Sequence, residues 1–297
     1  MIDVGILGLD TSHAEKFAAA IDDRPDAAVA GVWDDGEVRE ESYVSAFREE
    51  YGAARYDRPE AMVGEVDAAM VLTADWDRHR PIAEGFLEAG VPTCIDKPIA
   101  GRLGDVEELR ATAERTGTPI CGGSAVPHHP SIDGMRDDGG SHDLFAAGYN
   151  GPFYYGVHLT DTARRVCGAD WTAIEPTTHG SATAISFADG STATLRFAGP
   201  TNPSAFGFLD VGETIRTARI NGDETELERM YDPFIDAFLA TARGERADAD
   251  WLFDAATLLL GVQAALENGV VVEPGSSELA AVDRDGAAFA EGYEPLY

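Results

Sequence analysis

Short apolar runs and segments with helical spacing alternate along roughly the first 120 residues. The apolar runs are rich in β-branched and small residues, which favours strands, whereas apolar positions three or four residues apart favour helices. The predicted strands are 2–9, 27–33, 66–73, 92–96 and 119–122. The predicted helices are 14–21, 38–51, 58–63, 78–89 and 103–116.

This alternation predicts a parallel sheet covered on both faces by helices, because parallel strands need crossover connections. Right-handed crossovers then give a Rossmann-like, doubly wound α/β domain. We assign it to residues 1–123.

The pattern changes after residue 123, where alternating runs follow one another and two helical segments close the chain. Asp189 and Gly190 give a hairpin signal between the first two runs. The predicted strands are 181–187, 191–197, 205–210 and 213–220, and the helices are 231–242 and 251–267. We therefore expect residues 124–297 to form an α+β domain with an open, mainly antiparallel sheet.

The chain of 297 residues contains 53 Asp and Glu against 22 Lys and Arg, which gives a formal charge of −31. This charge excludes nucleic-acid binding through a basic face and docking on an anionic membrane. Disorder is excluded by the 44% hydrophobic content and the clear periodicity. The composition is typical of a folded protein from a salt-rich cytoplasm, where a Debye length of about 3 Å screens self-repulsion at molar salt.

The three cysteines, Cys94, Cys121 and Cys167, have no metal-type spacing and are predicted to be buried thiols. The N-terminus leads directly into a strand, and no apolar run reaches the roughly 18 residues of a membrane span. We therefore expect a cytoplasmic protein.

Lysine is almost absent from the chain, since Lys16 and Lys97 stand among 22 basic residues. Lys97 follows an apolar strand in Asp96-Lys97-Pro98. An ammonium group can shift its pKa and exchange a proton, whereas a guanidinium stays charged. A lysine retained at this position therefore indicates proton chemistry, and the alternative is a structural cation paired with Asp96.

Ligands of a doubly wound sheet bind at the carboxyl ends of its strands. These ends carry residues 8–13, Asp34, residues 73–77 and Asp96-Lys97-Pro98. We expect these residues to lie together in one crevice at that edge of the sheet.

At these positions the sequence resembles the Gfo/Idh/MocA family of NAD(P)-dependent oxidoreductases, whose Glu-Lys-Pro motif appears here as Asp96-Lys97-Pro98. The resemblance runs from residue 1 to about residue 125 and continues weakly through His158 and the closing helices. It implies hydride transfer between a nicotinamide and a sugar, polyol or related hydroxy compound. It also places Lys97 beside the reacting carbon, where the ammonium can stabilise an alkoxide or relay its proton.

The resemblance further implies a set of cofactor-binding residues. They are Gly8, Asp10, Thr11, Ser12, His13, Asp34, Thr73, Ala74, His79, Asp96 and Lys97. Asp96 matches the family glutamate and would hold Lys97 charged, and His79 is expected to be structural or near the cofactor. A carboxylate at Asp34 binds ribose hydroxyls and repels a 2′-phosphate, which predicts NAD rather than NADP.

The family usually carries a second catalytic pair, an Asp followed four residues later by a His. His158 fits the His position, but the Asp position holds Tyr154. We expect His158 to act as a general base or to bind a substrate hydroxyl, with Asp161 or a tyrosine hydroxyl near it. The alternative is a histidine packed at the start of a helix.

The first turn departs from the dinucleotide fingerprint, which uses three glycines to bring the backbone close to a pyrophosphate. Gly8 is retained, but Asp10 stands at the second glycine, where its carboxylate would repel the phosphates. Alternatively the turn is shortened, and His13 matches the family histidine that follows the third glycine. Thr11, Ser12 and His13 could donate hydrogen bonds instead of bare amides, or the turn no longer binds a dinucleotide well.

Three classes of function remain open: an NAD-dependent oxidoreductase, a lyase, hydrolase or epimerase that uses its cofactor transiently, and a non-catalytic binding protein. The retained Lys97 argues against the last. His128 and His129 lack ligand-spaced Cys or acid partners, so no metal is predicted. The family resemblance implies a homodimer or homotetramer that forms through the exposed face of the second sheet.

Overall fold

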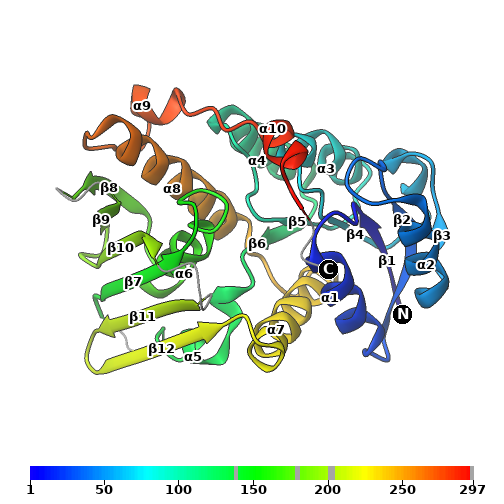
Figure 1. Cartoon of the computed structure of the whole chain (residues 1–297), viewed down its shortest axis with the longest axis horizontal. Helices are drawn as coiled ribbons and strands as arrows, with labels where there is room; N and C mark the ends of the chain where they lie inside the picture. The colour runs from blue at the N-terminus through cyan, green and yellow to red at the C-terminus, as the bar shows by residue number, and fades with distance from the viewer. Residues whose placement is uncertain (137–139, 178–180, 200–204, 295–297) are drawn as a thin grey trace.

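The computed structural model describes residues 1–136, 140–177, 181–199 and 205–294, and these form two six-stranded sheets with helices between and around them (Figure 1). The first sheet has the order β3-β2-β1-β4-β5-β6, and all its strand pairs are parallel. Its strands are β1 Ile2–Leu7, β2 Ala27–Trp33, β3 Ala54–Arg55, β4 Ala68–Val71, β5 Thr93–Asp96 and β6 Ile120–Gly123. The doubly wound prediction is therefore confirmed.

Helices connect these strands in the predicted order. They are α1 Ser12–Asp22, α2 Glu41–Tyr51, the 3₁₀ turns η1 Pro59–Met62 and η2 Trp76–Arg78, α3 His79–Glu88 and α4 Leu103–Thr116. Every residue of β4 and β5 is buried, as expected for strands covered on both faces. The strand order reverses between β1 and β4, so the topological switch point lies where these two strands end.

The second sheet is mixed and mainly antiparallel, with the order β12-β11-β7-β10-β9-β8 and one parallel pair, β7 with β10. Its strands are β7 Asp143–Tyr149, β8 Trp171–Pro176, β9 Ala182–Phe187, β10 Thr192–Gly199, β11 Ala205–Val211 and β12 Ile215–Asn221. The hairpin at Gly190 and the strands β9 to β12 match the prediction, whereas β7 and β8 were not predicted.

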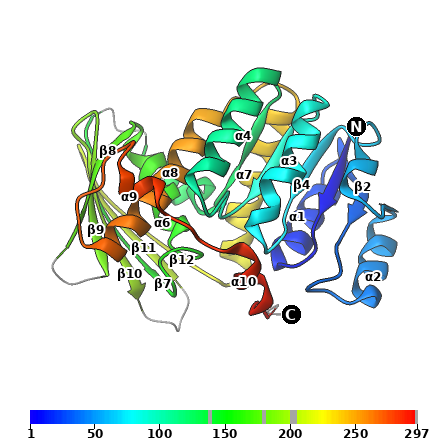
Figure 2. The same ribbon diagram turned by 90° about the horizontal axis from the view of Figure 1, so that it is seen from above.

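The remaining helices join the two halves of the molecule. They are η3 Val126–His128, α5 Pro130–Asp133, α6 Val157–Cys167, α7 Glu224–Ala242, α8 Ala249–Asn268, α9 Ser277–Ala280 and α10 Gly286–Glu291. Figure 2 shows α6 and α8 between the second sheet and α4, and α7 packs on α1. Because α7 and α8 touch both halves, the predicted domain boundary at residue 123 stays a prediction.

Helix α8 is long and apolar enough to cross a membrane by length and composition. However, 67% of its apolar window is buried inside the protein, which is typical of a core helix. The three cysteines are also buried, as predicted, and carry free thiols.

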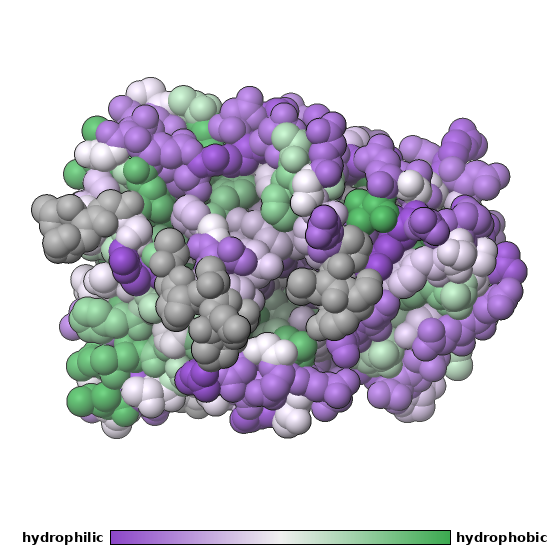
Figure 3. Space-filling model, in the orientation of Figure 1, coloured by the Kyte–Doolittle hydropathy of each residue, from purple (hydrophilic) through white to green (hydrophobic). Residues whose placement is uncertain are grey.

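The outer face of the second sheet exposes apolar side chains. Phe145 is 49% exposed and lies directly opposite Leu209, which is 36% exposed. Val211 and Ile215, a pair of β11 and β12, extend this group. Figure 3 shows a hydrophobic area at the lower left, where Figure 1 places β11 and β12. The inner face, by contrast, packs on α6 and α8.

Candidate functional site

The ends of β1 and β4 approach each other closely at the switch point. Gly8 has a φ of +93°, and a Cβ there would lie 2.8 Å from the backbone nitrogen of Thr73. Only glycine fits both the conformation and the space. This approach places the first turn against Ala74, whose N–H donates to Oδ2 of Asp10 at 2.7 Å.

The first turn is short, because α1 begins at Ser12 with Thr11 as its N-cap. The Thr11 hydroxyl accepts from the backbone N–H of His13 at 3.2 Å. The His13 ring in turn lies with Nδ1 2.8 Å from a carboxylate oxygen of Asp96. The first turn is thereby tied to the end of β5, a contact that sequence reasoning did not foresee.

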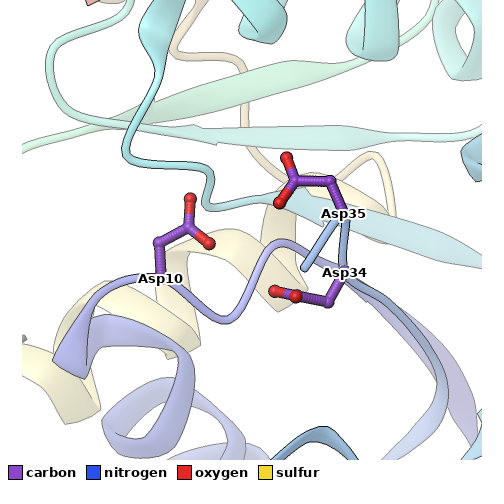
Figure 4. A group of neighbouring side chains, drawn as sticks. All are labelled: Asp10, Asp34 and Asp35. Atoms are coloured by element: carbon purple, nitrogen blue, oxygen red, sulfur yellow. The ribbon is translucent and has the colours of Figure 1, made fainter. Parts of the chain in front are cut away.

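Asp10 lies beside Asp34 and Asp35, which follow β2, and the three carboxylates come within 4.8 Å of one another (Figure 4). Burial is the main cause that raises the pKa of Asp10 to about 7. Its Oδ1 atom is buried and has no hydrogen-bond partner in the part of the chain that the structure describes. A protonated Asp10 adds no negative charge to Asp34 and Asp35 beside it.

Asp34 occupies the position predicted for ribose binding, but both of its oxygens already accept backbone hydrogen bonds. The N–H of Leu9 donates to one oxygen at 2.8 Å, and the N–H of Gly36 donates to the other at 2.9 Å. Each carboxylate oxygen has a second lone pair, so these bonds orient the group and leave room for ribose hydroxyls. Burial raises the pKa of Asp34.

Lys97 directly follows β5, and only 5% of its surface is exposed. Its ammonium nitrogen lies 3.3 Å from the centre of the Tyr154 ring, in a cation–π geometry. Burial lowers the pKa of Lys97 to about 8, and the charge of Asp96 opposes this shift. Asp96 itself remains charged: burial favours its neutral form, but His13 and Lys97 hold its pKa below the usual value.

His158 lies in the first turn of α6 and is held by Ser124, at the end of β6. Its Nδ1 is 2.7 Å from the Ser124 hydroxyl oxygen, which also accepts from the N–H of Val126 at 3.1 Å. The backbone N–H of Ser124 donates to Asp161 at 2.8 Å. Ser124 was not predicted, because a serine after a short strand carries no sequence signal.

Burial lowers the pKa of His158 well below its usual value, so the ring is neutral near pH 7. The buried hydroxyl hydrogen of Ser124 then has Nδ1 as its acceptor. This leaves Nε2 as the protonated nitrogen, so His158 presents a donor. Burial raises the pKa of Asp161 to about 7.

A cavity of about 220 Å³ lies between the first turn, β5, α6 and the second sheet. Six predicted site residues line it: Thr11, Ser12, His13, Lys97, Tyr154 and His158. The others lie outside its lining: Gly8, Asp10, Asp34, Thr73, Ala74, His79, Asp96 and Asp161. Additional lining residues that were not predicted include Asn221, Tyr231 and Tyr293.

Three other histidines have structural surroundings. His79 is fully buried, with one ring nitrogen 2.9 Å from the carbonyl oxygen of Thr73 and the other 3.2 Å from that of Ile99. His128 packs edge-on against Phe234, and burial lowers its pKa to about 3. His129 lies 3.3 Å from Glu226, a single acid that does not make a metal site.

Comparison with known proteins gives the class of the N-terminal domain. Residues 2–123 match the profile of the Gfo/Idh/MocA family, described as an oxidoreductase family with an NAD-binding Rossmann fold. The resemblance seen in the sequence is therefore confirmed over these residues.

Individual relatives agree with this class. A myo-inositol dehydrogenase, Hyg17 from Streptomyces leeuwenhoekii, is 40% identical over 81 residues, which is 26% of this chain and 25% of that protein. The match thus spans a quarter of the relative's length.

Two solved structures share the fold over nearly the whole chain. GenD2 from gentamicin A biosynthesis, in complex with NAD, has a TM-score of 0.77 and 17% identity over 93% of this chain and 97% of its own. A scyllo-inositol dehydrogenase from Lactobacillus casei, with bound NAD(H) and scyllo-inositol, has a TM-score of 0.75 and 15% identity over 93% and 100%. The second domain therefore follows the fold of these dehydrogenases.

The Ser124–His158 contact predicts the tautomer of His158. In ¹⁵N NMR spectra at pH 7 we expect a neutral ring protonated at Nε2, with the signals assigned by their absence from His158→Gln. Ser124→Ala should give a mixture of tautomers and lower the free energy of unfolding by about 1–3 kcal/mol, because Nδ1 loses its partner. The exposed Ser131→Ala is the control, and a ring protonated at Nδ1 in the unchanged protein would contradict the assignment.

Proposed function

We propose that this protein is an NAD-dependent oxidoreductase that transfers a hydride between the nicotinamide and a polyol or sugar-like hydroxy compound. The observation that carries the proposal is the position of Lys97, buried in a cavity at the carboxyl edge of a family-type Rossmann sheet. The inositol dehydrogenases among its relatives support a cyclic polyol as the substrate class.

The described residues fit the ribose and the phosphates of NAD. Asp34 lies after β2, where a ribose binds, and its charge disfavours a 2′-phosphate and hence NADP. The N-terminus of α1 at Ser12 offers the favourable end of a helix dipole to the phosphates. Asp10 fits when it is protonated, because the neutral acid does not repel the phosphates.

Three side chains of the cavity have different roles in moving and stabilising the proton of the substrate hydroxyl. The cofactor, when bound, accepts the hydride. Lys97 has a pKa of about 8, so a substantial fraction is neutral in mildly alkaline solution and accepts the proton of the substrate hydroxyl. His158, neutral and protonated at Nε2, is a hydrogen-bond donor that orients a substrate oxygen. Tyr154 stabilises the ammonium form of Lys97 once the proton has moved.

A second candidate, a lyase, hydrolase or epimerase that uses the cofactor transiently, is favoured by two departures from the family pattern. Asp10 replaces a glycine of the first turn, and Tyr154 replaces an acid. Product analysis separates the two candidates, since this class consumes substrate without a net change in NADH absorbance.

Lys97→Ala should lower turnover of a polyol about 10²- to 10⁴-fold, because the proton acceptor is lost. The affinity for NADH, measured by fluorescence titration in molar KCl, should change little. For the unchanged protein the rate of alcohol oxidation should rise with pH through about 8, where Lys97 becomes neutral. Lys16→Ala is the matched control, since it removes the other lysine. Full activity in Lys97→Ala would remove Lys97 from the mechanism.

The protonated Asp10 predicts that NADH binding takes up a proton. Affinity should fall as pH rises above about 7, by up to about tenfold per pH unit, since the ionised Asp10 repels the pyrophosphate. Asp10→Asn, which mimics the neutral acid, should bind NADH with little pH dependence, and the exposed Asp57→Asn should behave like the unchanged protein. Fluorescence titrations between pH 6 and 9 test this, and an affinity that is constant over this range would refute it.

We also propose that the protein forms a homodimer or homotetramer through the outer face of the second sheet. Phe145 and Leu209 are exposed side by side there, and apolar patches of this kind mark protein interfaces. The double variant Phe145→Asp with Leu209→Asp should be monomeric by light scattering in molar KCl and retain its circular dichroism. Val271→Asp, on an exposed loop, is the control. A monomeric unchanged protein would overturn this proposal.

A further inference from the structure

The C-terminal segment 284–294 packs on the first domain, where α10 contacts η2 (Figure 1). Its Tyr293 lines the cavity that contains Lys97. Trp76 in η2 donates its indole N–H to the carbonyl oxygen of Arg284 at 2.7 Å. The backbone N–H of Gly286 donates to Asp77 at 2.9 Å. The start of the segment is therefore fixed by two hydrogen bonds, one at Arg284 and one at Gly286, the first residue of α10.

Two glycines allow this close docking. A Cβ at Gly101 would overlap the carbonyl oxygen of Arg284. A Cβ at Gly286 would overlap the carboxylate of Asp75 and lie 2.8 Å from the backbone nitrogen of Trp76. The first domain and the segment thus meet with no room for a side chain at either position, which indicates a specific contact.

An aromatic stack connects the segment to the lysine. The Phe289 ring lies 5.0 Å from that of Trp76 and 4.3 Å from that of Tyr154, measured between ring centres. Tyr154 in turn lies 3.3 Å from the Lys97 ammonium. The hydroxyls of Tyr154 and Tyr293 are hydrogen-bonded to each other, and Tyr293 lines the cavity.

We propose that the segment 284–294 is a wall of the active site, in which Phe289 is a positioning residue that holds Tyr154 against Lys97. The site depends on this support because the family acid is replaced by Tyr154, whose ring binds the ammonium only while it stays in place. Phe289 also excludes water from the ring on which Lys97 rests. The inference deepens the proposed function, yet it concerns the surroundings of Lys97 and is tested without turnover.

Several titratable groups face or lie near Lys97, on elements of both domains. They are Asp96 and His13 of the first domain, Tyr154, Tyr155 and His158 before and within α6, and Tyr293 of the C-terminal segment. Asp96 is the carboxylate among them, and the Phe289 variants leave it and its bond to His13 in place. A change in the titration of Lys97 in these variants therefore reports its exposure to water.

The scarcity of lysine makes this measurement direct. In a Lys16→Arg background, ¹³C-labelled lysine gives a side-chain signal from Lys97 alone. Its chemical shift, followed by NMR between pH 6 and 11, should titrate near pH 8. Phe289→Ala should raise the midpoint by about one pH unit or more, because water reaches the ammonium and stabilises its charge.

Matched variants separate positioning from general damage. Phe289→Leu keeps an apolar cover and should restore the midpoint to near that of the unchanged protein. Glu291→Ala changes an exposed residue of the same helix and should have no effect. Gly101→Ala, which displaces Arg284 without touching Phe289, should raise the midpoint and gives a second measurement if Phe289→Ala does not fold.

An unchanged Lys97 midpoint in folded Phe289→Ala, or in Gly101→Ala, would overturn the proposal. These results do not depend on catalysis. A protein that shows the midpoint shift but oxidises no polyol would keep the wall and refute the proposed function. A protein that oxidises polyols but shows no midpoint shift in these variants would refute the wall and keep the proposed function.

Discussion

The burial of the Lys97 ammonium is the constraint around which the site is built. A charged group removed from water is costly unless it is paired or loses its proton, and here both effects operate. Asp96 supplies the opposite charge, while burial brings the pKa of the lysine down to about 8. The Tyr154 ring adds a cation–π contact worth about 1–2 kcal/mol in a desolvated setting. The lysine is therefore poised between its two protonation states.

That balance depends on segments far apart in the chain. His13 from the first turn holds the charge of Asp96, and α6 supplies His158, which lines the same cavity as Lys97. The C-terminal segment contributes Phe289, nearly 200 residues after Lys97 in a chain of 297 residues. Because each contact acts on a different neighbour of the ammonium, the cavity is formed only when both domains and the C-terminal segment are folded together.

The first half of the fold could be predicted because its strands are buried on both faces and read as continuous apolar runs, as in 68–71. The strand that ends in Asp96-Lys97 also placed the candidate lysine at the carboxyl edge. By contrast, β7 contains Ala146, Ala147 and Gly148, which carry a weak strand signal. Helix α6 is buried on almost every side although it carries polar residues such as Thr160 and Asp161, and a segment with such residues does not by itself predict a buried helix.

The contacts that tune the site escaped prediction for a different reason. His13 with Asp96, Ser124 with His158 and Phe289 with Tyr154 each join residues brought together by tertiary packing, and no local spacing marks them. In the first turn, one feature could be predicted from the sequence and another could not. Asp10 was recognised as a departure from a glycine pattern, but the sequence could not show that its carboxylate would be buried, bonded to Ala74 and able to hold a proton near neutral pH.

The acidic composition adds a last consequence for the same crevice. A net charge of −31 repels an anionic dinucleotide at long range, and Asp34 and Asp35 concentrate that charge at the mouth of the first turn. At molar salt the Debye length shrinks to about 3 Å, so the long-range repulsion disappears and only contacts inside the crevice matter. The local protonation of Asp10 then decides whether the phosphates meet a neutral or a charged side chain. Surface acidity and the altered first turn are thus compatible with a dinucleotide under the same high-salt conditions.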